Sequence, residues 1–441
     1  MKLKEAISIP CGLRYMVDSL DIQSGVARRM LLEQDMAVLP QEVESGLEHL
    51  SRMSAVVLNE NNALSVRTLQ FRLQGLKDLR TTLDNLRSGR MLDDIELFEI
   101  KHLAMLTAEI AQLTEKMDMS AHLPDLSSVV SALDPEGLHI ATFYIYDAYC
   151  PGLKQMRSEL ELHPTDEKLF IRIQDEENRI RVSLSAELIR YVEQLADALY
   201  QLAQMDILLA KALQMRALSL CIPTTGRTTS LVGMWNPEVE EAIRMKGGSY
   251  QRNSISFASH PTILTGSNMG GKTVVLRTVA LCQLLTQFGF AVPAEQAEVA
   301  VKDAVYVSMA DGQSVQEGLS SFAAEMRRID SIIAAARANR NILALIDEPA
   351  RTTNPIEGTA LVSALIEVLK QTSISMLLVT HYTINAHACP CLRVRGMENG
   401  RMNYELVPAL EGEVPHEALH IAEQLGVDTQ WIALAHELTQ R

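Results

Sequence analysis

Long apolar runs are missing from this sequence of 441 residues. A helix that crosses a bilayer needs about 20 consecutive, mostly apolar residues. The longest runs here, such as residues 342–346, have only the length of a strand. No apolar segment with a small-residue cleavage site follows the first lysines, so we expect no signal peptide. These absences argue against a membrane protein and predict a location in the cytoplasm.

Cysteine is also scarce, with six residues at positions 11, 150, 221, 282, 389 and 391. So few, and so widely spaced, they do not form the framework of a small disulfide-rich protein, and they fit a reducing compartment. Cys389 and Cys391 form the only close pair, and no second pair with zinc-site spacing accompanies them. The sequence assigns these two thiols no role.

Positive charge is in deficit, because 40 lysines and arginines face 55 acidic residues and give a net charge of −15. Proteins that bind nucleic acid usually carry a basic face, since neutralising phosphates supplies much of their affinity. An acidic total leaves room for a local basic patch but counts against a protein that depends on DNA.

Residues 1–220 predict a helical domain. Between residues 95 and 117, apolar side chains recur at spacings of three and four, which places them on one stripe of a helix; they are Leu103, Leu106, Ile110, Leu113 and Met117. A second long helix is predicted over residues 185–219, where no glycine or proline interrupts the same pattern.

A small β-containing insertion is predicted between these helices, at about residues 140–184. Residues 142–151 have the composition of a strand, and residues 167–184 that of a hairpin with its turn near Asp175 to Asn178. The segment 165–184 carries four basic and five acidic residues, so it offers no basic stripe that could follow a phosphate backbone.

From residue 221 to residue 441 short apolar strands alternate with helices, which predicts an α/β domain with a mostly parallel sheet. The expected strands are 262–266, 304–309, 342–347 and 375–381, and the expected helices are 272–288, 320–338 and 357–370. Two further helices, at residues 416–425 and 429–440, are expected to close the chain.

A nucleotide-binding loop of the form G-x-x-x-x-G-K-[ST] follows the first of these strands. It consists of Gly266, Ser267, Asn268, Met269, Gly270, Gly271, Lys272 and Thr273. Glycines permit the positive φ angles that turn successive N–H groups toward phosphate oxygens. Lys272 is expected to contact the β- and γ-phosphates, and the Thr273 hydroxyl to bind Mg²⁺. The motif predicts a P-loop domain that binds ATP with Mg²⁺.

Three polar residues follow the next apolar strands and complete the predicted chemistry. Asp347 ends the strand 342–347 and is a candidate Mg²⁺ ligand. Glu348 is the candidate base that orients or deprotonates water, and His381, after the next strand, is a candidate γ-phosphate contact. With Lys272, these residues predict a Mg²⁺-dependent ATPase, in which Glu348, His381 and Lys272 are catalytic.

Four segments resemble the MutS ATPases, the mismatch-repair relatives of the ABC ATPases, in their order and spacing. They are TGSNMGGKT (265–273), GLSSFAAEM (318–326), DEPARTTNPIEG (347–358) and VTHY (379–382). The likeness is strong over about 235–440 and looser over about 20–220. It implies an ABC/MutS-like ATPase domain at residues 221–441, with dimerisation helices at its C-terminal end, preceded by a helical core or lever domain at residues 1–220.

The resemblance also implies a homodimer with ATP held between two subunits. Gly318 and Ser320 would approach the γ-phosphate bound by the partner, although a plain helix cap is the alternative for Ser320. A further segment would lie across the interface and couple the two sites; it comprises Arg351, Thr352, Thr353 and Asn354.

The chain departs from the family motifs at several positions. The mismatch-repair members have Pro where Ser267 stands, Arg where Leu319 stands, and Gly where Ala350 stands. The trans contact thereby loses a guanidinium, the group best suited to paired phosphate contacts. We also expect no mismatch-recognition domain, only a short clamp, and no C-terminal nuclease-like domain.

The sequence leaves open which molecule the ATP-driven conformational change acts on. This molecule is called the client here, and two classes of client are considered. The truncated architecture and the DEPARTTNP segment resemble the MutS-related component of a reactivating system for adenosylcobalamin-dependent lysine or ornithine aminomutases. That resemblance favours a protein partner that ATP closure and hydrolysis remodel. The alternative is a DNA clamp for mismatch repair or recombination. Arg252 and Asn253, which precede the nucleotide loop, are weak candidates for contacts to adenine.

Overall fold

The computed structural model divides the chain into two compact units, each described by itself. The sheet unit combines Met1–Leu20, Gln34–Leu50 and Gln214–Arg441, and the helical unit combines Asp21–Glu33 and Ser51–Leu213. Two segments from the first fifty residues thus cluster with the sheet unit, although a boundary at residue 220 assigns them to the helical domain. The structure describes residues 1–119, 122–140, 142–266, 270–309, 321–338, 340–382, 384, 389–398, 401–409 and 427–439.

A six-stranded sheet forms the centre of the sheet unit, with the strand order β10-β9-β4-β8-β7-β6. Its strands are β4 (Pro261–Thr265), β6 (Ala304–Ser308), β7 (Ile342–Asp347), β8 (Ser375–Val379), β9 (Cys391–Glu398) and β10 (Arg401–Pro408). All neighbours pair in parallel except β9 and β10, which form an antiparallel pair. The strands expected from the apolar runs are therefore confirmed, and the chain is a mixed α/β protein.

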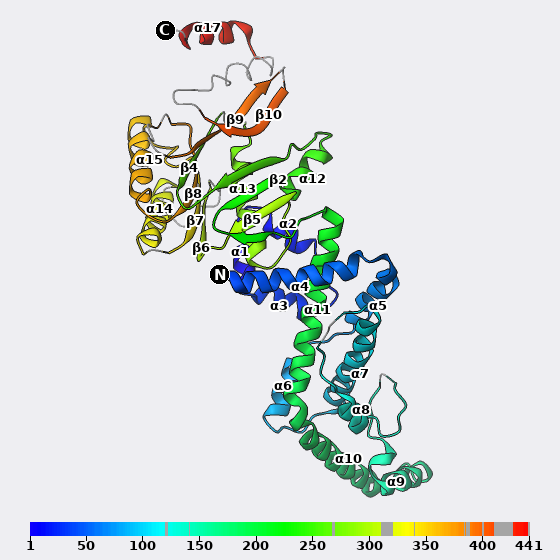
Figure 1. The fold of residues 1–441 in the computed structure, drawn as a ribbon. Coiled ribbons are helices and arrows are strands. Elements are labelled where there is room, and N and C mark those ends of the chain that lie inside the picture. Colours follow the sequence, from blue (N-terminus) through cyan, green and yellow to red (C-terminus); the bar gives the residue numbers. More distant parts are fainter. Residues whose placement is uncertain are drawn as a thin grey trace. The chain divides into compact units, whose positions relative to one another are not determined.

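Helices cover both faces of this sheet (Figure 1). Helices α14 (Ser321–Arg337) and α15 (Pro355–Leu369) pack on one face, where Ile342, Ala344 and Ile346 of β7 join their core. Helix α13 (Lys272–Gln287) covers the opposite face, toward which Leu343 and Leu345 point by the two-residue period of a strand. A strand buried on both faces is apolar throughout, which explains the continuous run in β7.

A second sheet, which the sequence did not predict, has the order β1-β5-β2-β3. Its strands are β1 (Thr224–Gly226), β2 (Thr229–Met234), β3 (Asn253–Phe257) and β5 (Gln296–Ala300). The other helices of the sheet unit are α1 (Leu3–Ala6), α2 (Leu13–Asp18), α12 (Pro237–Met245) and α17 (Thr429–Thr439). The expected helix at residues 429–440 is thus present, whereas the one at 416–425 lies outside the described residues.

The helical unit contains α3 (Gly25–Glu33), α5 (Ala63–Leu73), α6 (Arg80–Arg87), α7 (Asp94–Lys116), α8 (Ser127–Leu133), α9 (Pro151–Leu162) and α10 (Glu167–Leu188). Helices α4 (Pro40–Leu58) and α11 (Val192–Leu218) contribute residues to both units. The predicted helix at residues 95–117 is confirmed as α7. The helix expected over 185–219 is interrupted, because a 3₁₀ turn at Ile189–Tyr191 separates α10 from α11.

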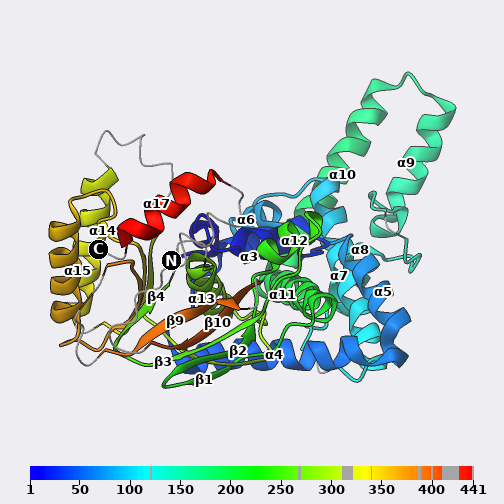
Figure 2. The ribbon, with the colours of Figure 1, turned by 90° about the horizontal axis from the view of Figure 1, so that it is seen from above.

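The predicted β-containing insertion at residues 140–184 is wrong for the residues that the structure describes there. The expected hairpin at 167–184 is part of α10, which Asp166 caps by accepting a hydrogen bond from the Leu169 N–H at 3.1 Å. Leu169, Ile173 and Ile180 are buried at spacings of four and seven, which is a helical stripe. The expected strand at 142–151 has only a 3₁₀ turn at Asp147–Tyr149 before α9 begins. Figure 2 shows α9 and α10 as a helical pair.

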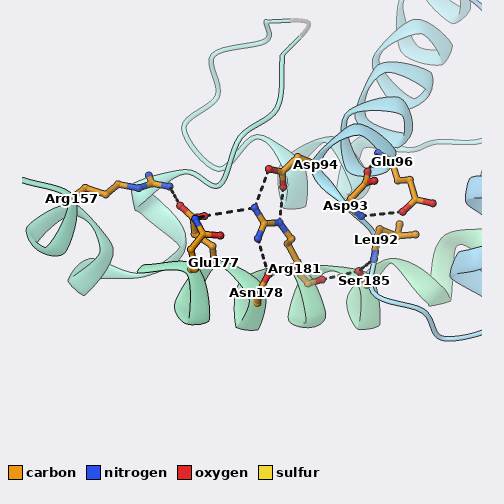
Figure 3. Close-up of polar contacts among 10 residues, drawn as sticks. Leu92, Asp93, Asp94, Glu96, Arg157, Glu177, Asn178, Arg181 and Ser185 are labelled. Carbon is orange, nitrogen blue, oxygen red and sulfur yellow. Dashed lines mark hydrogen bonds and ion pairs between the residues drawn. The ribbon is translucent and has the colours of Figure 1, made fainter. Parts of the chain in front are cut away.

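A polar network joins α10 to the start of α7 (Figure 3). The guanidinium of Arg181 donates two hydrogen bonds to the Asp94 carboxylate, at 2.8 and 3.0 Å. Ser185 accepts a hydrogen bond from the Leu92 N–H at 2.9 Å and donates one to the Arg181 carbonyl at 2.7 Å. Such paired geometry fixes direction as well as distance, so the network orients α10 against α7.

Within the described residues, no helix combines the length and the apolar character needed to cross a bilayer.

Replacing Arg181 with Lys is expected to weaken the contact between α10 and the start of α7, because lysine cannot form the paired hydrogen bonds with Asp94. Arg181 is 14% exposed at its side chain and Asp94 44%, so solvent weakens the pair and we expect a loss of only about 1 kcal/mol. Hydrogen exchange measures this loss of stability, because the backbone amides of α10 should exchange faster in the variant than in the wild type. Arg179→Lys, which alters an exposed pair with Glu176, is the control; equal exchange in both variants would contradict the prediction.

Candidate functional site

The segment after β4 has the backbone of a phosphate-binding loop in the part that is described. Gly266 has a φ of 131° and Gly271 a φ of 71°, both in the region that disfavours residues with a Cβ. Gly271 is the N-cap of α13 and has no side chain that could cap the helix, so the N–H groups of the first turn point toward the loop, where an anion would bind. Ser267, Asn268 and Met269 lie outside the described residues, and Gly270 precedes the cap.

Lys272 is the first residue of α13, and its side chain spans the loop. The residue is only 4% exposed, and its Nζ donates a hydrogen bond to the Gly266 carbonyl at 2.7 Å. A buried ammonium at the positive end of a helix repels other cations and attracts an anion. The lysine therefore stands where the motif requires it for contact with phosphate oxygens.

Thr273 and Asp347 come together at the site although 74 residues separate them in the sequence. The Thr273 hydroxyl donates a hydrogen bond to Asp347 Oδ2 at 2.7 Å. The other carboxylate oxygen, Oδ1, is buried and has no hydrogen-bond partner among the residues that the structure describes. Burial raises the pKa of Asp347, the hydrogen bond from Thr273 lowers it, and the charge of Glu348 raises it further. A hydroxyl beside an unsatisfied buried carboxylate oxygen is a donor set that fits Mg²⁺, which prefers hard oxygen ligands.

The strand register brings the predicted residues to one edge of the sheet, here called the carboxyl edge. Val379 at the end of β8 is level with Leu264 of β4 on one side and with Asp347 of β7 on the other. The Glu348 N–H donates to the Val379 carbonyl at 3.0 Å. Gly266, Glu348 and His381 consequently leave the sheet at the same edge, as neighbouring parallel strands require.

Glu348 occupies a strained backbone position directly after β7. Its φ is 46°, which is uncommon for a residue with a Cβ and costs about 1 kcal/mol or more. The side chain is 17% exposed, and its carboxylate lies 3.6 Å from the guanidinium of Arg351. Strain of this kind concentrates at functional sites, where surrounding contacts hold it.

His381 follows β8 and is exposed, with its ring centroid 4.5 Å from that of Tyr382. It is therefore accessible to a ligand at the carboxyl edge. The structure thus brings together Lys272, Thr273, Asp347, Glu348 and His381.

The residues expected at a subunit interface are described only in part. Asn354 caps α15, because its side chain accepts a hydrogen bond from the Ile356 N–H at 2.9 Å. Arg351 and Thr352 are exposed, and the Thr353 N–H donates to the Ala350 carbonyl at 3.2 Å. Gly318 and Ser320 lie outside the described residues.

Sequence analysis missed Tyr404, an aromatic residue of β10 beside the phosphate loop. A Cβ on Gly271 would lie 3.2 Å from the Tyr404 ring. Side-chain amides bind both backbone groups of Tyr404: Gln251 accepts from its N–H at 3.0 Å, and Asn253 donates to its carbonyl at 2.6 Å. Each of these two partners is about 150 residues away from Tyr404 in the sequence, so no local sequence pattern links them to it.

The two weak candidates for adenine contacts are engaged elsewhere in the structure. The Arg252 guanidinium lies 4.1 Å from the centroid of the Trp235 ring and pairs with Glu295 at 3.1 Å. Asn253 binds the backbone of β10 at Tyr404 and Leu406, where the pairing of β10 with β9 is irregular. Asn253 therefore holds the strand that carries Tyr404.

Comparison with known proteins agrees with this geometry. A model of the MutS domain V family matches residues 262–399. Endonuclease MutS2 of Thermus thermophilus is 32% identical in an alignment of 291 residues that covers 64% of this chain and 37% of that protein. Endonuclease MutS2 of Streptococcus mutans is 26% identical in an alignment of 418 residues that covers 86% of this chain and 51% of that protein. The chain thus spans between about a third and about half of the length of these relatives.

Replacing Asp347 with Asn is expected to stabilise the chain in buffer that contains a chelator. Since the folded-state pKa of this carboxyl lies above its usual value, the charged form destabilises the fold at neutral pH. The neutral amide removes that penalty, and its oxygen can still accept from Thr273. Stabilising changes at functional positions typically contribute about 1 kcal/mol.

Thermal unfolding followed by circular dichroism measures the effect as a higher melting temperature. The control is Asp330→Asn, which neutralises an exposed carboxylate of α14 and should leave the melting temperature unchanged. A lower melting temperature for Asp347→Asn would contradict the interpretation that the charged Asp347 carboxylate destabilises the fold and is kept for function.

Proposed function

We propose that this chain, which belongs to the MutS family through its domain V, binds ATP with Mg²⁺ at the carboxyl edge and hydrolyses it. The observation that carries this proposal is the 2.7 Å hydrogen bond from Thr273 to Asp347, whose second oxygen is buried without a partner among the described residues. Two candidate metal ligands are thereby pre-positioned beside a phosphate-binding loop and a buried lysine.

Each residue has a definite part in the proposed reaction. The N–H groups at the start of α13 and the Lys272 ammonium bind the phosphate oxygens and neutralise their charge. Thr273 and Asp347 would hold Mg²⁺, which screens the charge that develops on the β- and γ-phosphates. Glu348 orients a water molecule toward the γ-phosphate and accepts its proton, while His381 donates a hydrogen bond to the γ-phosphate.

A second copy of the chain completes the site in this proposal. Gly318 and Ser320 of one chain would contact the γ-phosphate held by the other, and the exposed Arg351 and Thr352 would lie between the two sites. The support is the resemblance of these segments to the family motifs, together with the exposure of Arg351 and Thr352. ATP then favours the closed dimer to the extent that it binds the closed state more tightly than the open one.

We infer that DNA is the client, because both relatives are named endonucleases, and an endonuclease cleaves nucleic acid. The match to the Streptococcus mutans relative covers 86% of this chain, so it includes most of the helical unit as well as the sheet unit. The aminomutase-reactivating role that the sequence favoured gains no support from the names of these relatives. We limit the proposal to ATP hydrolysis and DNA binding because the chain spans only part of each relative.

Replacing Glu348 with Gln is expected to leave ATP binding intact and to slow hydrolysis by roughly 10²–10⁴-fold, the usual contribution of a general base. The amide keeps the size of the side chain but cannot accept the proton. Phosphate release gives the rate, and titration with a fluorescent ATP analogue gives the affinity. Glu357→Gln, at an exposed glutamate in the first turn of α15, is the matched control. Normal turnover in Glu348→Gln would remove Glu348 from the mechanism.

Binding to branched, mismatched and perfectly paired duplexes of equal length tests the proposed client. With ATP and the Glu348→Gln variant, the full chain is expected to prefer a branched or mismatched duplex by at least about tenfold, or 1.4 kcal/mol. The acidic total predicts a shallow dependence of affinity on salt, because few phosphates are neutralised. Fluorescence anisotropy at about 0.15 M salt measures both quantities. Weak and equal binding of all three duplexes would contradict DNA as the client.

A further inference from the structure

Ala350, two residues after Glu348, is held at both of its backbone polar groups by side chains from other elements. Its N–H donates a hydrogen bond to Glu325 Oε2 at 3.3 Å, and its carbonyl accepts one from the Tyr382 hydroxyl at 2.8 Å. The residue is 1% exposed and has a φ of 59°, a left-handed conformation that is unusual for alanine. Glycine stands at this position in the family motif and adopts such angles without strain.

The two side chains that bind Ala350 come from different parts of the site. Glu325 lies in the second turn of α14, and Tyr382 directly follows His381 and packs against its ring. Gly358 of α15 provides the space for this arrangement, since a Cβ there would lie 2.3 Å from the Tyr382 hydroxyl oxygen. Ala350 is therefore the point at which α14, the His381 segment and the turn after β7 meet.

The turn after β7 needs such restraints because its backbone is strained twice. Glu348 and Ala350 both have positive φ, at 46° and 59°, on either side of Pro349. Each such residue costs about 1 kcal/mol or more, so the conformation persists only where surrounding contacts hold it. If the turn relaxed, the direction of the Glu348 side chain would change with it.

Packing is incomplete beside the turn on the side of α14 and α15. A mostly apolar cavity of about 280 Å³ lies between these helices, and Pro349, Ala350, Met326 and Leu365 are among the residues that line it. Atoms beside a cavity lack contacts on that side. The hydrogen bonds of Ala350 with Glu325 and Tyr382 are consequently its side-chain restraints, beside the local bond that its carbonyl accepts from the Thr353 N–H at 3.2 Å. Burial raises the pKa of Glu325, and the hydrogen bond from the Ala350 N–H and the charges of Arg328 and Arg351 oppose that rise.

We propose that Glu325 and Tyr382 are positioning residues that fix the strained turn at Ala350 and thereby aim Glu348 at the attacking water. This inference rests on the proposed ATPase function. It makes the rate of hydrolysis depend on α14 and on the His381 segment, neither of which contains the base. Any displacement of α14 or of Tyr382 is transmitted through Ala350 to the direction of the Glu348 carboxylate.

The test compares ATP turnover and nucleotide affinity in Glu325→Ala, Glu325→Gln and Tyr382→Phe. Because misplacement of a catalytic group by about 1 Å can lower a rate by 10²-fold, we expect kcat to fall by at least about tenfold in Glu325→Ala and Tyr382→Phe. KM and the affinity for a fluorescent ATP analogue should stay within about twofold, since no phosphate contact is lost. Glu325→Gln should retain most of the activity, because its amide oxygen can accept from the Ala350 N–H.

The double variant distinguishes a shared action from two separate ones. Glu325 and Tyr382 restrain the same residue, so the combined loss of kcat should be smaller than the product of the two single losses. Glu357→Ala and Tyr306→Phe, changes of the same chemical kind elsewhere in the sheet unit, should leave kcat unchanged.

Several results would overturn the inference. One is normal kcat in Tyr382→Phe, a variant that keeps its ring and is expected to fold. Another is an equal loss in Glu325→Gln and Glu325→Ala, which would indicate that the charge rather than the Ala350 contact matters. If the wild-type chain hydrolyses ATP and Glu348→Gln does not, these results count against the positioning role alone. An inactive wild-type chain would instead overturn the proposed function, and the inference with it.

Discussion

The parallel pairing of β4, β8 and β7 is the constraint on which the candidate site depends. Leu264, Val379 and Asp347 are level across these strands, so the three segments that follow them start from the same edge. The register brings Thr273, at the start of the helix after β4, within hydrogen-bond distance of Asp347, at the end of β7. A shift by one residue would turn Asp347 to the other face of the sheet. The chemistry of the site is thus a consequence of strand register.

The site carries the features of a region shaped for function at the expense of stability. One oxygen of Asp347 is buried without a partner, Lys272 is almost fully buried, and Glu348 and Ala350 have positive φ. The unpaired oxygen and the buried lysine are unfavourable for the isolated fold, and an anionic ligand with a divalent cation would compensate both. The apolar residues of β7 and β8, by contrast, pack against helices on both faces of the sheet.

Much of this site could be predicted from the sequence because its residues follow apolar strands directly. An apolar run such as residues 342–346 has the length of a buried strand, and two carboxylates at the end of such a strand lie at the sheet edge. The contacts of Ala350 could not be predicted, because Glu325 and Tyr382 reach it across 25 and 32 residues. The same is true of Tyr404, whose partners are Asn253 in β3 of the other sheet and Gln251 just before that strand.

The error at residues 167–184 has a local cause. Phe170 and Ile171 are apolar but more than half exposed, and they concealed the helical spacing of the buried Leu169, Ile173 and Ile180. Bulky and β-branched residues raise the strand propensity of any short window. The hydrogen bond from the Leu169 N–H to Asp166 and the contact of Arg181 with Asp94 then decide in favour of a helix, since tertiary contacts outweigh propensity.

The dependence of ATP affinity on Mg²⁺ tests the central claim most directly, namely that the carboxyl edge is assembled to hold a nucleotide with its cation. A fluorescent ATP analogue is titrated into the full chain with Mg²⁺ and with a chelator, for the wild type and for Thr273→Ala. The account predicts that Mg²⁺ tightens wild-type binding by about tenfold or more, since a contact with a charged group contributes about 1.5–3 kcal/mol, and that this gain is lost in Thr273→Ala. Equal affinity with and without Mg²⁺ in the wild type would contradict it.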